Sequence, residues 1–243
     1  KWASHKLNDT VSLIRQTGPR EWEVLDLVAD EADWSLSRQT LEAMASTEHS
    51  PRQAFAIFWT MYTDLTLDNE NPIVKQILQE TDEFLHKFTT ESTPDYNSFG
   101  FYAVFLETVR RDSDRAEAMF ERAITADSTD ADNLGNYAVF LKTVRREYDR
   151  AEAMYERAIT ADPTNTHILG NYSQLLFAIG RDETAIVLAT RALSLSNPDE
   201  KSIVTECRFY LFAHSLEHRR ESGENLRDLL AAGVTTGSWS FEP

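Results

Sequence analysis

The apolar positions of this chain recur at helical spacing, and from about residue 98 onward the whole pattern repeats. Residues 98–132 and 133–167 align with 24 of 35 positions identical. In the second copy, apolar or small residues at helical spacing predict one helix over Asn133–Val144 and another over Asp149–Ala161. Pro163 ends the second helix, because a proline disfavours helical geometry in the residue before it. The stripe of the first helix consists of Leu134, Tyr137, Ala138 and Leu141.

The period continues beyond the second copy with a slightly shorter third unit. The triplet Arg157-Ala158-Ile159 has counterparts that begin 35 residues earlier at Arg122 and 34 residues later at Arg191. A single helical pair cannot bury its own apolar face, so consecutive pairs are expected to stack on each other. Small residues that recur at the start of each second helix are expected to be buried where the helices touch. They are Ala116, Ala151 and Ala185.

These residues carry a resemblance to tetratricopeptide repeats over about residues 95–197. Each unit has a large apolar residue, then a tyrosine, then a small residue, with alanines in the second helix and an Asp-Pro type of stop. A degenerate fourth unit continues to about residue 232, with a long helix over Glu200–His218 and a shorter one over Ser222–Ala232, closed by Gly233. The recurring triads are Phe99, Tyr102 and Ala103; Leu134, Tyr137 and Ala138; and Leu169, Tyr172 and Ser173.

The resemblance also implies a binding surface. In tetratricopeptide arrays the first helix of each pair lines a concave groove that holds another protein or peptide. The groove of this chain is expected to mix polar and apolar side chains, and it lacks the lysine and asparagine set that chaperone-binding members use to hold a C-terminal carboxylate. The groove positions implied by the resemblance are Phe101, Val104, Glu107, Asn136, Val139, Lys142, Asn171, Gln174 and Phe177.

Residues 1–92 do not follow the repeat and are expected to form a separate helical domain before the array at 93–243. Amphipathic patterns predict helices over Glu21–Asp33 and Ser37–Ser46, and two more that open at Ser50-Pro51 and Asn71-Pro72. Part of this segment resembles a small bacterial helical domain of unknown function. Such domains accompany toxin and immunity genes, which is an analogy at the level of the fold.

Composition narrows the classes of partner. The formal net charge is −16, which repels nucleic acid and anionic membranes and favours a basic partner. No apolar run reaches the roughly 18 residues of a membrane helix, and no signal-peptide pattern opens the chain. A single cysteine, Cys207, cannot form an internal disulfide. We therefore expect a cytoplasmic protein that binds neither nucleic acid nor membrane.

One motif raises the possibility of an enzyme. Residues 214–218 spell the HxxEH pattern of one class of zinc peptidases, with His214 and His218 as possible ligands. The motif needs a further ligand that the sequence does not place, and the alternative is a solvated helix end where histidines are favoured by the dipole. We expect no metal, no cofactor and no catalytic residues.

Together these patterns predict an all-α repeat protein that binds another protein without catalysing a reaction. The most specific hypothesis is a bacterial immunity or adaptor protein whose groove and acidic surface sequester a cognate protein, such as a basic toxin. The alternatives are a regulatory scaffold for a signalling partner and a zinc-dependent hydrolase that uses residues 214–218.

Overall fold

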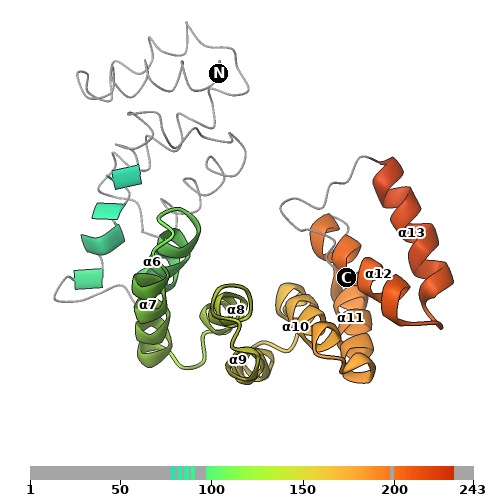
Figure 1. The fold of residues 1–243 in the computed structure, drawn as a ribbon, viewed down its shortest axis with the longest axis horizontal. Helices are drawn as coiled ribbons and strands as arrows, with labels where there is room; N and C mark the ends of the chain where they lie inside the picture. Colours follow the sequence, from blue (N-terminus) through green and yellow to red (C-terminus); the bar gives the residue numbers. More distant parts are fainter. Residues whose placement is uncertain are drawn as a thin grey trace, which may run out of the picture. The chain divides into compact units, whose positions relative to one another are not determined.

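A computed structural model describes residues 78–79, 82–83, 85–87, 89–90, 97–197 and 200–232. In these residues all regular structure is helical, which confirms the prediction of an all-α repeat fold (Figure 1). The helices predicted before residue 71, the C-cap at Gly233 and the tail that follows lie outside the described residues. The chain divides into two compact units, Lys1–Ala123 and Ile124–Pro243. The predicted domain boundary at residues 92 and 93 stays a prediction.

In the first unit, α6 (Asn97–Thr108) and the start of α7 (Ser113–Ala126) form the first repeat. Residues of the segment 78–90 contact them: the Tyr102 hydroxyl donates a hydrogen bond of 2.6 Å to Asp82, and Arg122 donates one of 2.7 Å to the Thr89 carbonyl oxygen. The described residues of this segment are helical, in agreement with the helix predicted from Asn71-Pro72.

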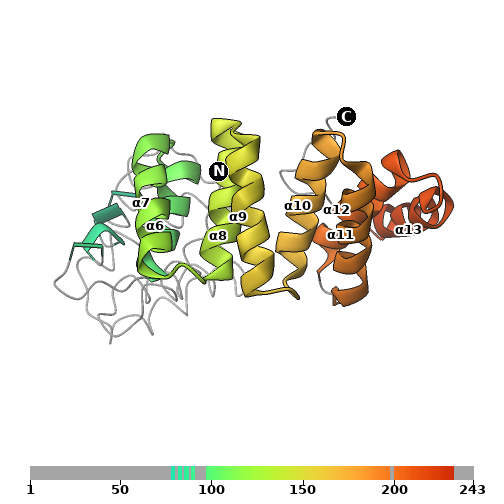
Figure 2. The same ribbon diagram turned by 90° about the horizontal axis from the view of Figure 1, so that it is seen from below.

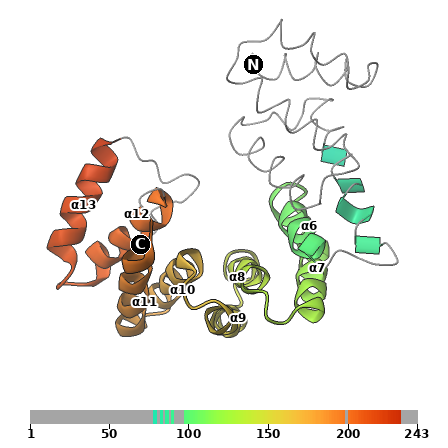
Figure 3. The same ribbon diagram turned by 180° about the vertical axis from the view of Figure 1, so that it is seen from behind.

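The second unit stacks three helical pairs. The first pair is α8 (Ala131–Phe140) with α9 (Tyr148–Ala161), the second is α10 (Thr166–Ala178) with α11 (Asp182–Leu195), and Figure 2 shows the members of each pair side by side. The third is α12 (Lys201–His214) with α13 (Arg219–Ala231), seen from behind in Figure 3.

Polar side chains cap α8 and α10 at their N-termini. Asp130 accepts a hydrogen bond of 2.9 Å from the backbone N–H of Asn133, and Asn165 accepts one of 3.2 Å from that of Ile168. At the start of the second helices, Ala151 and Ala185 are fully buried, as is Ala116 in the first unit, which confirms the predicted contacts.

The additional residue of the 35-residue copies is accommodated in the turn between their two helices. In the second copy, α8 continues into a π-helical turn, η2 (Leu141–Arg145), and the Glu147 N–H reaches back six residues to the Leu141 carbonyl oxygen. In the shorter third unit, the corresponding hydrogen bond spans only five residues, from the Arg181 N–H to the Leu176 carbonyl oxygen. One residue of each turn has a left-handed backbone conformation: Arg111 in the first copy, Arg146 in the second and Gly180 in the third. Glycine adopts this conformation without steric cost because it has no Cβ atom.

The last unit differs from the sequence prediction. The helix expected over Glu200–His218 ends at His214, and the next helix begins at Arg219 rather than Ser222. The physical reason is Ser215, which is buried and extended, and whose Oγ accepts a hydrogen bond of 3.4 Å from the His218 N–H. A serine that bonds the local backbone in this way competes with the helical hydrogen bonds.

One substitution between the two copies leaves a buried polar atom without a partner. Tyr155 is fully buried, and its hydroxyl has no hydrogen-bond partner among the described residues, whereas the first copy has Phe120 at this position. We predict that Tyr155→Phe stabilises the protein by about 1 kcal/mol, because an unsatisfied buried hydroxyl loses its hydration without compensation. Chemical denaturation measures this change, and the reverse substitution Phe120→Tyr is the matched control, expected to destabilise. A destabilised Tyr155→Phe protein would contradict the prediction.

Candidate functional site

The first helices of the second unit, α8 with η2, α10 and α12, form one face of the stack, which we call the first-helix face. Figure 1 shows α8 and α10 on one side of this unit and α9 and α11 on the other. Glycines permit the close approach of the first helices. A methyl group added to Gly135 would lie 3.0 Å from Ile168, and one added to Gly170 would lie 2.2 Å from Ile203.

The structure places the residues that sequence analysis assigned to the groove at different depths. In the second unit, Asn136 is exposed, and Val139, Lys142 and Asn171 are half-buried. Gln174 and Phe177 lie beneath the surface, with exposed fractions of 8% and 4%. These two side chains can shape the face but offer little area for direct contact. In the first unit, the corresponding residues are half-buried, and they are Phe101, Val104 and Glu107.

A chain of hydrogen bonds crosses the first-helix face. The Lys142 ammonium donates to Gln174 Oε1 over 3.3 Å, and Gln174 Nε2 donates to Glu206 Oε2 over 2.6 Å. These bonds join η2, α10 and α12. Burial lowers the pKa of Lys142 to about 8, against the opposing effect of Glu206. Burial also raises the pKa of Glu206, although hydrogen bonds from Ser202 and Gln174 oppose the shift.

Comparison with known proteins agrees with this architecture. A tetratricopeptide repeat family model matches residues 145–201. A crystal structure of MamA superposes with a TM-score of 0.52 at 12% identity, over 69% of this chain and 95% of the MamA chain, and therefore shares its fold. A second MamA structure, AMB-1, gives a TM-score of 0.48 at 18% identity, over 74% and 95% of the two chains. No curated protein matches the sequence significantly.

Residues 145–201 therefore match the tetratricopeptide repeat family, and the fold around them is of the same repeat type. The two near-identical repeats of the chain differ in an informative way. The second helices, residues 114–127 and 149–162, are the same at every position except the buried pair Phe120 and Tyr155. The first helices, by contrast, differ at four positions. Two are buried, Ser98 against Asn133 and Phe99 against Leu134, and two are positions that sequence analysis assigned to the groove, Phe101 against Asn136 and Glu107 against Lys142. Two accessible positions of the first helices have therefore diverged between the copies, while the accessible positions of the second helices, over residues 114–127 and 149–162, have not.

The histidines of the HxxEH motif do not share a helix in this repeat protein. His214 is the last residue of α12 and stacks on Phe177, with ring centroids 4.7 Å apart, whereas His218 precedes α13 and its Nδ1 lies 2.8 Å from Ser215 Oγ. Two zinc ligands one helical turn apart require a continuous helix, so the motif lacks the geometry that its spacing suggested. In the part of the chain that the structure describes, no three His, Cys, Asp or Glu side chains are grouped to hold a metal.

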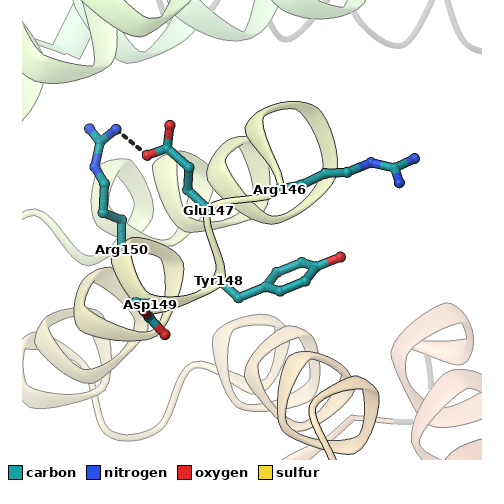
Figure 4. A pocket seen from close by; sticks show the side chains of 5 residues that line it. All are labelled: Arg146, Glu147, Tyr148, Asp149 and Arg150. Atoms are coloured by element: carbon teal, nitrogen blue, oxygen red, sulfur yellow. Dashed lines mark hydrogen bonds and ion pairs between the residues drawn. The ribbon is translucent and has the colours of Figure 1, made fainter.

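A shallow pocket of about 390 Å³ lies at the turn after η2 (Figure 4). It is lined by one continuous segment, residues 146–150, in which Arg150 pairs with Glu147 while the side chains of Arg146 and Tyr148 extend away from that pair. Because a single turn supplies the whole lining, no groups from other helices converge there as they do in a catalytic cleft. The first-helix face remains the best candidate for a binding site.

No helix in the described residues has both the length and the apolar character needed to cross a membrane.

Proposed function

We propose that the chain binds another protein on its first-helix face and catalyses no reaction. The observation that carries this proposal is the divergence between the two copies, which changes groove positions and preserves the second helices. A change of charge from Glu107 to Lys142 is not needed to support the fold, because residues 114–127 and 149–162 of the second helices are identical at every accessible position. Changes of charge and shape on one face alter which partner fits it.

The more specific proposal is that the protein is a cytoplasmic bacterial immunity or adaptor protein that sequesters a basic partner, such as a toxin. Its support is the formal net charge of −16. A field of this sign speeds the encounter with a positively charged protein and is weakened by salt. In this proposal the first-helix face determines which partner binds, and the acidic surface increases the rate at which a basic partner associates.

The test begins with a partner identified by a pull-down from the native organism and then measured by titration calorimetry. We predict that Asn136→Ala combined with Asn171→Ala weakens binding tenfold or more, which is about 1.4 kcal/mol, with no loss of folding. These two side chains are the accessible polar groups at equivalent positions of α8 and α10. Binding energy in protein interfaces is concentrated in a few central residues.

The matched control combines Glu156→Ala with Thr190→Ala, which changes two exposed side chains on the second helices α9 and α11. This control should bind as the parent does. A loss of binding in the control but not in the asparagine variant would move the site to the second helices, and a loss only on deletion of residues 1–96 would move it to the N-terminal part. A partner with an acidic surface, or an association rate independent of salt, would contradict the immunity proposal.

A further inference from the structure

Lys142 is a half-buried cation whose hydrogen-bonding capacity is mostly unused. An ammonium group carries three N–H donors, and the one hydrogen bond of Lys142 within the described structure is the 3.3 Å contact with the neutral Gln174 amide. The amide lies between Lys142 and Glu206, so that these two charges form no direct ion pair. Burial disfavours the charged form of Lys142 and lowers its pKa to about 8. The ammonium has thus lost hydration without gaining a counter-ion in direct contact, and Glu206 acts on it only from beyond the Gln174 amide.

The other members of the hydrogen-bond chain are better satisfied. The Glu206 carboxylate accepts hydrogen bonds from Gln174 at 2.6 Å and from Ser202 at 3.2 Å. Gln174 uses both its oxygen and its nitrogen in the chain. Lys142 is therefore the member of this network that still requires a hydrogen-bond acceptor, preferably an anionic one.

We propose that Lys142 receives the carboxylate of an aspartate or glutamate side chain of the protein that binds the first-helix face, which makes Lys142 a determinant of specificity. The inference rests on the proposed function. An incoming carboxylate in contact with the ammonium would be closer to Lys142 than to Glu206, which lies beyond the Gln174 amide, so that attraction exceeds repulsion at these separations. A charge-assisted hydrogen bond of this kind is stronger than a neutral one.

The surroundings of Lys142 favour a side chain from within a bound segment over the end of a chain. Asn136 lies earlier on α8 and Asn171 lies on α10, and both are accessible. A bound segment can therefore continue past Lys142 with polar contacts on the same face. The first copy has Glu107 at the equivalent position, so only the second repeat is expected to prefer an acidic side chain of the partner.

The experiment selects phage-displayed random peptides, which have no free C-terminus, against the parent protein, Lys142→Gln and the control Lys201→Gln. Lys201 is an exposed lysine at the start of α12. The parent and the control should enrich peptides with Asp or Glu at one fixed position, and Lys142→Gln should not. Lys142→Arg, which keeps the charge, should retain the preference. Thermal unfolding of each variant shows that the differences do not come from misfolding.

A double-mutant cycle with a selected synthetic peptide gives the decisive measurement. Lys142→Gln, or replacement of the peptide acid by its amide, should each weaken binding tenfold or more, and the two changes together should cost little beyond either one. The pKa of Lys142, followed by NMR of its side chain, should rise when the peptide binds. Independent effects of the two changes would overturn the inference, as would an acid preference that persists in Lys142→Gln.

The two proposals fail in distinguishable ways. Peptides that lose affinity in the Asn136→Ala, Asn171→Ala variant but show no acid preference would overturn the role of Lys142 and leave the first-helix face as the binding site. Enriched peptides that are insensitive to the asparagines and to Lys142, or no enrichment at all, would contradict both proposals.

Discussion

Phe177→Ala should destabilise the protein by about 3–5 kcal/mol, the cost of removing a large buried aromatic side chain. Phe177 is nearly inaccessible, and its ring stacks on Tyr210 with centroids 5.4 Å apart and on His214 at 4.7 Å. The side chain thereby joins α10 to α12. Its loss would leave a cavity and remove the contacts that hold the last helical pair on the stack.

Phe212→Ala is the matched control, because Phe212 lies on α12 but is 42% exposed. It should cost less than half as much, since less apolar surface returns to water. Denaturant unfolding followed by circular dichroism measures both variants. Equal costs for the two substitutions, or a Phe177→Ala protein as stable as the parent, would show that the aromatic contact does not support the stack. A binding defect in Phe177→Ala therefore has to be corrected for unfolding before it is assigned to the groove.

Ala151→Leu should destabilise the protein by about 1–3 kcal/mol through overpacking. Ala151 is fully buried at the start of α9, and the three additional carbon atoms have no space to occupy there. Ala153→Leu, two residues along the same helix at an exposed position, is the control and should be within about 0.5 kcal/mol of the parent. The thermal midpoint of each protein provides the measurement. An unchanged midpoint for Ala151→Leu would mean that the alignment of the repeats is incorrect.

The repeat and its buried positions could be predicted from the sequence because they depend on local spacing. The alanine at the start of each second helix, the tyrosine of each first helix and the stop at Pro163 all follow from the pattern of one unit. The structure confirms Ala151 as a buried contact and α9 as a helix that ends just before Asp162.

The parts that sequence analysis missed depend on residues that are far apart in the chain. Glu206 completes the hydrogen-bond chain from Lys142 through Gln174, and each of these partners lies 32 residues from the next. The burial of Phe177 likewise depends on Tyr210, which belongs to the degenerate fourth unit and is brought onto Phe177 only by the stacking of α12 on α10. The break at Ser215 was missed because a helical apolar pattern continues across it, while a single buried hydroxyl decides where the helix ends.

The two glycine contacts of the first-helix face give both junctions between the helical pairs of the second unit the same construction, although only the α10 pair carries both the glycine and the isoleucine. Gly135 meets Ile168, and 35 residues later Gly170 meets Ile203, so that both junctions between successive pairs use the same two residue types at the same spacing. A unit that carries this glycine and this isoleucine can join an identical unit without new interface chemistry. Lengthening by duplication is therefore a change that such an array accommodates at its existing junctions, and each added unit contributes one more junction to its stability.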